Sequence, residues 1–255
     1  MPVAERYPMS RIGVVSALKD EADRFSRHLR IYAARHNGAL ETEIVRTGLG
    51  EERVIKALEN AFQAPPDALI VFGTAAGIDP SLKPGDLVAY TTVNTFKHSQ
   101  VSTSKALNDY LLAVLTPLNP QHGKGLSVVE AVCSVEEKRQ LYDSESCLCV
   151  DMESAAIARW AVQHKVPFAC LRAIVDGADR AVPSAALAGL RPDGTTDALA
   201  TCIALLKNPG QFAGLVRLAR DYNTAMNKLS VAARLIVSDL YDGNPKEFER
   251  SRAQH

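Results

Sequence analysis

Residues 68–77 read Ala-Leu-Ile-Val-Phe-Gly-Thr-Ala-Ala-Gly, an apolar run that passes directly into glycine and a hydroxyl side chain. A run of this kind, without polar alternation, is typical of a strand that helices cover on both faces. In such folds ligands bind beyond the carboxyl ends of the strands. The stretch therefore predicts a central strand at residues 68–73 and a ligand site directly after it.

On both sides of this stretch, short β-branched runs alternate with helical patterns along most of the chain. This alternation predicts a single α/β domain over residues 1–255, with its core at about residues 11–240, in three layers with a mostly parallel, mixed central sheet flanked by helices. Residues 182–196, with several Pro and Gly, are expected to form an irregular loop. The other expected strands are 12–16, 42–47, 86–93, 126–132, 147–150 and 167–175, and the expected helices are 20–29, 51–63, 104–115, 135–143, 154–164, 196–206 and about 211–237.

Composition excludes several classes of protein. The 255 residues include 29 basic and 29 acidic side chains, so no general attraction to nucleic acid is built in. The longest uncharged apolar stretch, residues 68–78, is shorter than the roughly 18 residues that a transmembrane helix needs. The first eleven residues lack the apolar segment of a secretory signal. The five cysteines form no CxxC pair, and three lie in apolar runs, which indicates a reduced, cytoplasmic protein.

Polar and small residues follow five of the expected strands, where a ligand site is expected. Each of these segments contains glycine, hydroxyl or carboxylate side chains, which is typical of a binding site rather than of plain loops. The segments are 16–21, 47–50, 73–77, 151–153 and 176–179.

The common cofactor and nucleophile motifs are absent from the sequence. Gly48 and Gly50 lack the third glycine of a dinucleotide-binding turn, and no phosphate-binding loop or GxSxG nucleophile motif is present. The six histidines have no metal-ligand spacing, so we expect neither a metal nor an organic cofactor.

Three carboxylates at different strand ends, Glu21, Glu153 and Asp176, suit cleavage through an oxocarbenium-like transition state. One acid protonates the leaving group, a second activates water, and a third binds sugar hydroxyls. Solvated loop carboxylates or helix caps are the alternative, since an acid in the first turn of a helix is favoured by the dipole alone. Composition and spacing by themselves favour this alternative.

Four motifs in order resemble the nucleoside phosphorylase and nucleosidase superfamily, in particular its methylthioadenosine/S-adenosylhomocysteine nucleosidase branch. They are SALKDE at 16–21, GTAAG at 73–77 with KPGD at 83–86, VDMESAA at 150–156, and RAIVDGAD at 172–179. The resemblance covers roughly residues 11–180. Farther on, ADRAVP at 178–183 and LRPDG at 190–194 are more similar to hopanoid-associated phosphorylases, which are thought to remove adenine from adenosylhopane.

The resemblance implies a role for each carboxylate. Asp176 matches the residue that protonates or hydrogen-bonds N7 of the purine, and Glu21 matches the residue that positions and deprotonates water. Glu153 matches the ligand of the ribose hydroxyls. We therefore expect Glu21 and Asp176 to be the catalytic residues.

The resemblance also implies substrate-binding residues. Met152 matches the apolar surface under the sugar, and Thr74, next to Gly73, replaces a serine near the nucleophile. The base is expected to rest near residues 131–134, where Val132 and Cys133 are the candidates.

Water is favoured over phosphate as the nucleophile. Phosphate in a dry site needs charge-assisted donors, and Val71 stands where the phosphorylases carry one phosphate-binding arginine. The other arginine falls near Glu21, whose carboxylate would repel phosphate, although Arg24 or Lys19 remains a possible substitute. Arg172 matches a family arginine whose role we interpret as structural before catalytic.

Together these features predict hydrolytic release of adenine from a nucleoside with a hydrophobic 5′ substituent, such as adenosylhopane in hopanoid biosynthesis. Alternatives are a methylthioadenosine/S-adenosylhomocysteine nucleosidase, a phosphate-dependent purine nucleoside phosphorylase and a non-catalytic nucleoside-binding module. The resemblance implies a homodimer or hexamer. A set of apolar residues lies near the C-terminus: Phe212, Leu215, Leu218, Leu229, Leu235 and Ile236. Three interpretations are open: they line a wide substrate mouth, contact a membrane surface, or pack on the sheet or on a partner subunit. Packing is the favoured interpretation.

Overall fold

The computed structural model describes residues 10–33, 40–95, 99–189 and 191–242. The strands of its mixed sheet are β1 (Arg11–Ser16), β2 (Glu41–Arg46), β3 (Ala68–Gly77), β4 (Leu87–Thr95), β5 (Gln100–Ser102), β6 (Gln121–Ser127), β7 (Cys149–Asp151) and β8 (Phe168–Asp176). The helices are α1 (Lys19–Ala33), α2 (Glu51–Ala61), α3 (Lys105–Val114), α4 (Val135–Glu145), α5 (Ser154–Gln163), α6 (Ser184–Ala188), α7 (Ala198–Lys207) and α8 (Phe212–Asp242), with 3-10 turns at Thr116–Leu118 and Pro209–Gln211.

The sheet closes partly on itself. Strand β3 pairs with β1, β7 and β8, while β8 pairs with β4, β4 with β6, and β6 with β7. Strands β3, β8, β4, β6 and β7 thus form a ring from which β1 and β2 extend. Five of the strand pairs are parallel, and β3–β7, β4–β5 and β4–β8 are antiparallel. The predicted mixed, mostly parallel sheet is confirmed.

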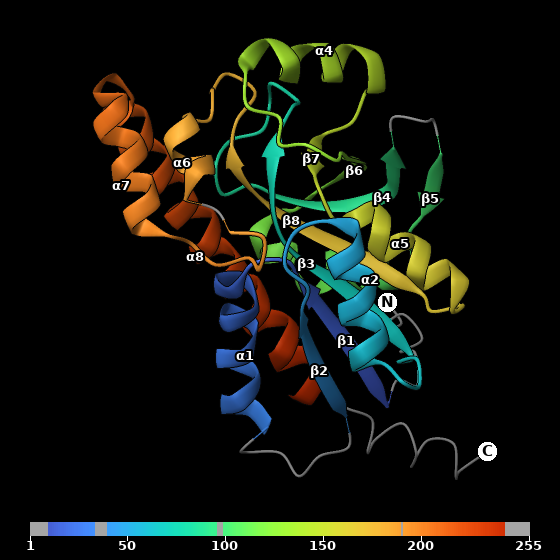
Figure 1. Ribbon diagram of the computed structural model, residues 1–255. Helices are drawn as coiled ribbons and strands as arrows, with labels where there is room; N and C mark the ends of the chain where they lie inside the picture. The colour runs from blue at the N-terminus through green and yellow to red at the C-terminus, as the bar shows by residue number, and fades with distance from the viewer. Residues whose placement is uncertain (1–9, 34–39, 96–98, 190, 243–255) are drawn as a thin grey trace, which may run out of the picture.

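Helices cover the sheet on two sides, which makes the three predicted layers (Figure 1). On one side α1, α3 and α8 pack against the sheet through residues such as Phe25, Leu111 and Leu229. On the other side α2 and α5 contribute residues such as Leu58 and Trp160. The central strands between these helices, such as β3 and β8, are buried on both faces, as their continuous apolar runs predict.

Two predicted elements differ from the structure. The strand expected at 126–132 is β6, at residues 121–127. A Cβ at Gly125 would lie 2.0 Å from the Tyr90 ring, and one at Gly123 would lie 2.5 Å from Leu148. Glycine is needed for this close packing. Because glycine is unfavourable inside strands, the sequence pattern does not predict a strand at these residues. The region expected to be an irregular loop contains the short helix α6.

The long C-terminal helix α8 packs mainly on the sheet. Leu229 and Ile236 are fully buried in the core, and Leu235 is packed against it, which confirms the packing prediction for these residues. Phe212, at the start of the helix, is 61% exposed. Within the described residues, none of the helices combines the length and apolar character needed to span a membrane.

Candidate active site

Glu21 lies in the first turn of α1, directly after β1, and is only 1% exposed. The backbone N–H of Thr74 and the Thr74 hydroxyl both donate to Glu21 Oε1, at 2.8 and 2.7 Å. The backbone N–H of Leu18 donates to Oε2 at 3.0 Å. Three donors from two neighbouring strand ends therefore hold this carboxyl group in one orientation.

The surroundings of Glu21 act on its pKa in opposite directions. Burial raises the pKa above its ordinary value, while Arg172 and the donors from Leu18 and Thr74 lower it and so favour the carboxylate. The net pKa of Glu21 is raised, and a carboxyl group with a raised pKa and a fixed orientation is suited to accept a proton from water.

Gly73 makes the approach to Glu21 possible. It pairs in register with Arg172 on β8, and a Cβ at this position would lie 2.6 Å from Arg172 Nη1 and 2.9 Å from Glu21 Oε2. The guanidinium and the carboxylate therefore both occupy the space beside this glycine. The sequence reading placed Gly73 in the substrate pocket, and the structure adds a packing requirement for it.

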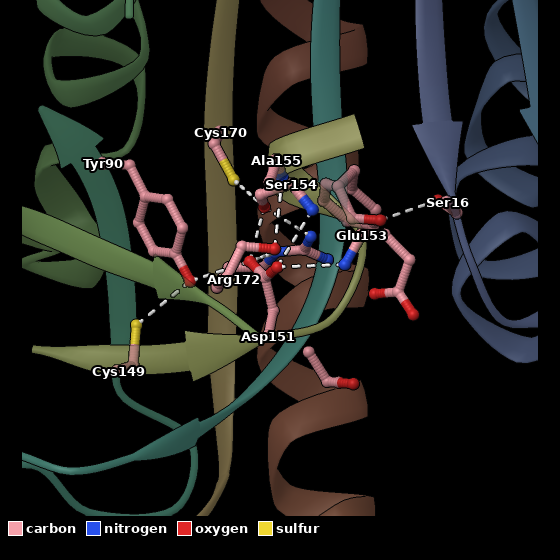
Figure 2. A network of polar contacts seen from close by, with 12 residues as sticks. Ser16, Tyr90, Cys149, Asp151, Glu153, Ser154, Ala155, Cys170 and Arg172 are labelled. Atoms are coloured by element: carbon pink, nitrogen blue, oxygen red, sulfur yellow. Dashed lines mark hydrogen bonds and ion pairs between the residues drawn. The ribbon is translucent and has the colours of Figure 1, made fainter. Parts of the chain in front are cut away.

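Arg172 belongs to a buried polar network with Asp151 (Figure 2). Its Nε donates to Asp151 Oδ2 at 3.0 Å, and its Nη2 donates to the Ser154 hydroxyl at 2.8 Å. Tyr90 also donates to Asp151 Oδ2, while the backbone N–H groups of Glu153 and Ser154 donate to Oδ1. This network fixes the turn between β7 and α5, on which Glu153 stands.

Glu153 is 6% exposed, and its Oε1 is buried without a hydrogen-bond partner. Burial, reinforced by the carboxylates of Asp151 and Glu21, raises the pKa of Glu153 to about 8, against the opposing effect of Arg172. Buried polar atoms are normally paired, so an orphaned oxygen beside a second carboxyl group indicates a place for a donor from a ligand. Sugar hydroxyls are such donors.

Asp176 ends β8 and is also 6% exposed. Lys138 of α4, which is completely buried, forms an ion pair with Asp176 Oδ2. Burial raises the pKa of Asp176, Lys138 and Arg180 lower it, and Asp221 adds to the rise. A carboxyl group with a raised pKa is suited to donate a proton to a leaving group.

The pairing of β3 with β8 sets the distance between the two predicted catalytic groups. Gly73 faces Arg172 and Ala76 faces Asp176, with a register shift between Ala75 and Ala76. The Glu21 anchor, Thr74, is therefore two residues before the level of Asp176, about 7 Å along the strand. The two carboxyl groups therefore belong to neighbouring levels of one strand pair.

The remaining predicted residues lie at an apolar cluster and beside Asp176. Met152 and Val132 both pack against the small cluster of Ile78, Leu126, Val128, Cys147 and Val150. The pKa of the Cys133 thiol is raised by burial and by the nearby Glu137 and Asp176. The structure thus groups Glu21, Gly73 and Thr74 with Glu153, places Cys133 near Asp176, and packs Val132 and Met152 on one apolar cluster.

A cavity of about 160 Å³ lies beside the start of α1. It is lined by residues 18–20, residues 194–196 and Tyr222. Residues 192–194 are fastened over the first two strand ends, since Lys19 N–H donates to Gly194 O and Leu49 N–H donates to Pro192 O. The segment that departs from the nucleosidase pattern therefore closes this side of the site.

Sequence reasoning missed Lys138. In the run Val135–Glu145 it reads as one of several solvated charges on a helix. The signal that was available is its position three and four residues before Leu141 and Tyr142, which places it on the apolar side of α4. A charged residue at such a position usually has a buried partner.

The profile of the phosphorylase superfamily matches residues 11–207. The chain belongs to the phosphorylase superfamily. This confirms the superfamily of enzymes that the four motifs predict.

Solved structures of the same fold include nucleosidases. This phosphorylase-superfamily chain superposes with a TM-score of 0.64 on Campylobacter jejuni 5′-methylthioadenosine/S-adenosylhomocysteine nucleosidase, at 16% identity, covering 91% of this chain and 99% of the other. Helicobacter pylori futalosine hydrolase matches with a TM-score of 0.65, also at 16% identity and the same coverage. The Neisseria meningitidis nucleosidase, in complex with methylthio-immucillin-A, matches with a TM-score of 0.63 at 15% identity, covering 90% and 100%.

Metal-ligating side chains do not gather in the described ranges, where no three His, Cys, Asp or Glu residues could hold an ion. The cysteines at 147, 149 and 170 are buried and free, as their apolar surroundings predict.

Proposed function

We propose that this chain hydrolyses the N-glycosidic bond of an adenine nucleoside. The observation that carries the proposal is that Thr74 of β3 holds Glu21 two residues before the level of Asp176 on β8, with the orphaned oxygen of Glu153 near Glu21. Three carboxyl groups in different environments provide the base, the acid and the sugar ligand that the reaction requires.

In the proposed mechanism, Glu21 removes a proton from a water molecule that attacks C1′ of the ribose. Thr74 holds Oε1 of Glu21, which leaves the carboxylate aimed at one point. Glu153 accepts hydrogen bonds from the ribose hydroxyls, and Met152 lies under the sugar. Asp176 donates a proton to N7, so adenine leaves as a neutral base. Buried carboxylates also stabilise the positive charge that develops on the sugar ring.

Water is proposed as the nucleophile because three side chains that could bind phosphate near Glu21 are apolar or already paired. Val71 is 1% exposed in the core and has no donor. Lys19 forms an ion pair with Asp23 at 2.5 Å, and Arg172 donates to Asp151 and Ser154. A dianion beside the Glu21 carboxylate would need a cation that is not already paired.

The favoured substrate carries a hydrophobic 5′ substituent, with adenosylhopane of hopanoid biosynthesis as the leading candidate. The cavity beside the start of α1 supports room next to the site for a 5′ group. Exposed apolar residues on α7 and at the start of α8 support contact with an apolar substituent: Ile203 is 46%, Leu206 81% and Phe212 61% exposed. Methylthioadenosine and S-adenosylhomocysteine are the alternative substrates, and a homodimer or hexamer is the proposed assembly.

The test is adenine release from methylthioadenosine, adenosine and adenosylhopane, each with and without phosphate. We expect release without phosphate, fastest from adenosylhopane. Glu21→Gln is expected to lower turnover by about 100-fold or more while nucleoside binding remains measurable. Glu52→Gln, the same change in the first turn of α2 at an exposed position, is the matched control.

Other outcomes would replace the proposal. Release that requires phosphate would identify a phosphorylase and overturn the choice of water. Full activity in Glu21→Gln would contradict the mechanism. Tight binding of all three nucleosides without release would identify a nucleoside-binding module.

A further inference from the structure

Lys138 is a buried cation that the mechanism above does not use. Its ammonium group donates to Asp176 Oδ2, to the carbonyl of Gly177 at 2.9 Å and to the carbonyl of Arg180 at 2.7 Å. An ammonium group has three donors, so each N–H has an acceptor. Lys138 therefore joins α4 to the end of β8 and to the turn that follows it.

Burial makes the charge state of this pair adjustable. Lys138 is 0% exposed and Asp176 is 6% exposed, so water contributes little to stabilising the two charges. In a medium of low dielectric, an ion pair loses much of its advantage over a neutral amine and a neutral carboxylic acid in contact. Transfer of a proton across this direct contact therefore costs little.

Other charged groups also face Asp176. Asp221 of α8 disfavours its carboxylate, and Arg180 of the following turn favours it. Arg180 and Asp221 form an ion pair with each other, so their effects on Asp176 partly cancel. Cys133, before α4, also senses the charge of Asp176. Lys138, the direct contact, is therefore the group that decides which form Asp176 takes.

We propose that Lys138 is a positioning residue that stores the proton which Asp176 passes to the departing base. This inference rests on the proposed nucleosidase function. Asp176 touches the substrate in this scheme, and Lys138 acts only through Asp176.

The proton and electron changes of the step balance. Lys138 gives one proton to the Asp176 carboxylate and becomes a neutral amine; a half-turn about the Asp176 Cβ–Cγ bond presents the O–H to the base. N7 receives this proton while the C1′–N9 bond breaks and its electron pair moves into the base. Water forms the new bond to C1′ and gives a proton to Glu21. After release, Glu21 loses its proton to solvent, and Lys138 regains one from solvent.

The storage of a proton on Lys138 has a consequence for pH dependence. With Lys138 present, Asp176 can draw a proton from the ammonium group that it contacts. Without it, Asp176 must hold the proton alone and loses it as the pH rises through the pKa of that single carboxyl group. The acidic side of the profile belongs to Glu21, which must be ionised, and is expected to stay the same.

The experiment compares Lys138→Met with wild type by measuring kcat/KM for methylthioadenosine across pH. We expect Lys138→Met to lie within about 10-fold of wild type near pH 5.5 and about 100-fold or more below it near pH 8.5. Arg139→Met is the matched control, because Arg139 is the next residue of α4 and its side chain is 64% exposed. It should follow the wild-type profile.

A second substrate separates proton delivery from damage to the fold. In 4-nitrophenyl 5-methylthio-β-D-riboside the leaving phenolate needs no proton, so Lys138→Met should cleave it within about 10-fold of wild type throughout. An equal loss on both substrates at every pH would show that Lys138 is only structural. An unchanged alkaline limb would also overturn the inference.

Failure of the proposed function would look different from failure of this inference. If the wild-type chain releases adenine from none of the three nucleosides tested above, the nucleosidase proposal fails and the inference fails with it. If wild type cleaves both and Lys138→Met shows no change with pH, only the inference fails.

Discussion

Two buried ion pairs each have one member on β8, and they differ in how their carboxylates are hydrogen-bonded. Arg172 pairs with Asp151, and four residues farther along the strand Asp176 pairs with Lys138. All four side chains are at most 9% exposed in these pairs. Burial and charge are therefore similar, and the contrast lies in how completely each carboxylate is hydrogen-bonded.

Both oxygens of Asp151 are used within the protein, by Arg172, Tyr90, Ser154 and the backbone of Glu153. Asp176 is bonded through Oδ2 alone, and its Oδ1 accepts no hydrogen bond from residues in the described ranges. A saturated carboxylate has no acceptor left for a ligand, whereas a half-used one does. The Arg172–Asp151 pair thus supports the scaffold, and the Lys138–Asp176 pair is left able to react.

The largest expected effect comes from applying one substitution to both pairs. Asp151→Asn leaves Arg172 buried without its counter-ion, and because arginine stays charged, we expect a loss of about 3 to 5 kcal/mol in the free energy of unfolding. Asp176→Asn leaves Lys138 with its two carbonyl acceptors, Gly177 and Arg180, so the expected loss is about 1 to 3 kcal/mol. Urea unfolding measures both.

Enzymatic activity, measured per folded molecule, should show the opposite order: Asp176→Asn is expected to lose more activity than Asp151→Asn. Asp176→Asn is expected to lower adenine release by about 100-fold or more, because the acid is gone. If Asp176→Asn were the less stable variant, the assignment of scaffold and reactive pair would be wrong.

Glu153 is a third buried carboxyl group, and one of its oxygens has no hydrogen-bond partner. Its pKa is raised from the ordinary 4.5 to about 8, so the folded protein favours the protonated form. Stability from this group is present below about pH 4.5 and is lost as the pH rises through about 8, on the order of 2 to 4 kcal/mol. Glu153→Gln should remove this component of the pH dependence of unfolding, and Glu52→Gln should leave it in place. An unchanged slope in Glu153→Gln would refute the buried, unpaired state.

The smallest expected change in stability is at Gly73, where Arg172 and Glu21 approach the backbone. A Cβ there would lie under 3.0 Å from Arg172 Nη1 and Glu21 Oε2, so Gly73→Ala should cost roughly 1 to 2 kcal/mol. It should also lower turnover by about 10-fold or more, since it displaces Glu21. Gly210→Ala is the control, because a Cβ there meets nothing within 4 Å. Equal effects of the two changes would contradict the close approach at Gly73.

Local sequence patterns were sufficient for most of the fold. The apolar run that begins β3 and the helical pattern of α5 each fall where the residue spacing predicts. The pattern failed at β6, where Gly123 and Gly125 are required by Leu148 and the Tyr90 ring. Such a requirement comes from a neighbouring strand, so a local reading cannot detect it.

Hydrophobic periodicity in the sequence is sufficient to predict the order of strands and helices. Given that order, the positions of Glu21, Glu153 and Asp176 in the chain place them at strand ends. Tertiary structure decided how each carboxyl group is paired. Lys138 reaches Asp176 across 38 residues of sequence, and Arg172 reaches Asp151 across 21. A carboxyl group's protonation depends on burial and on the charges within a few ångströms. Those neighbours come from distant parts of the chain, so only the folded structure brings them together.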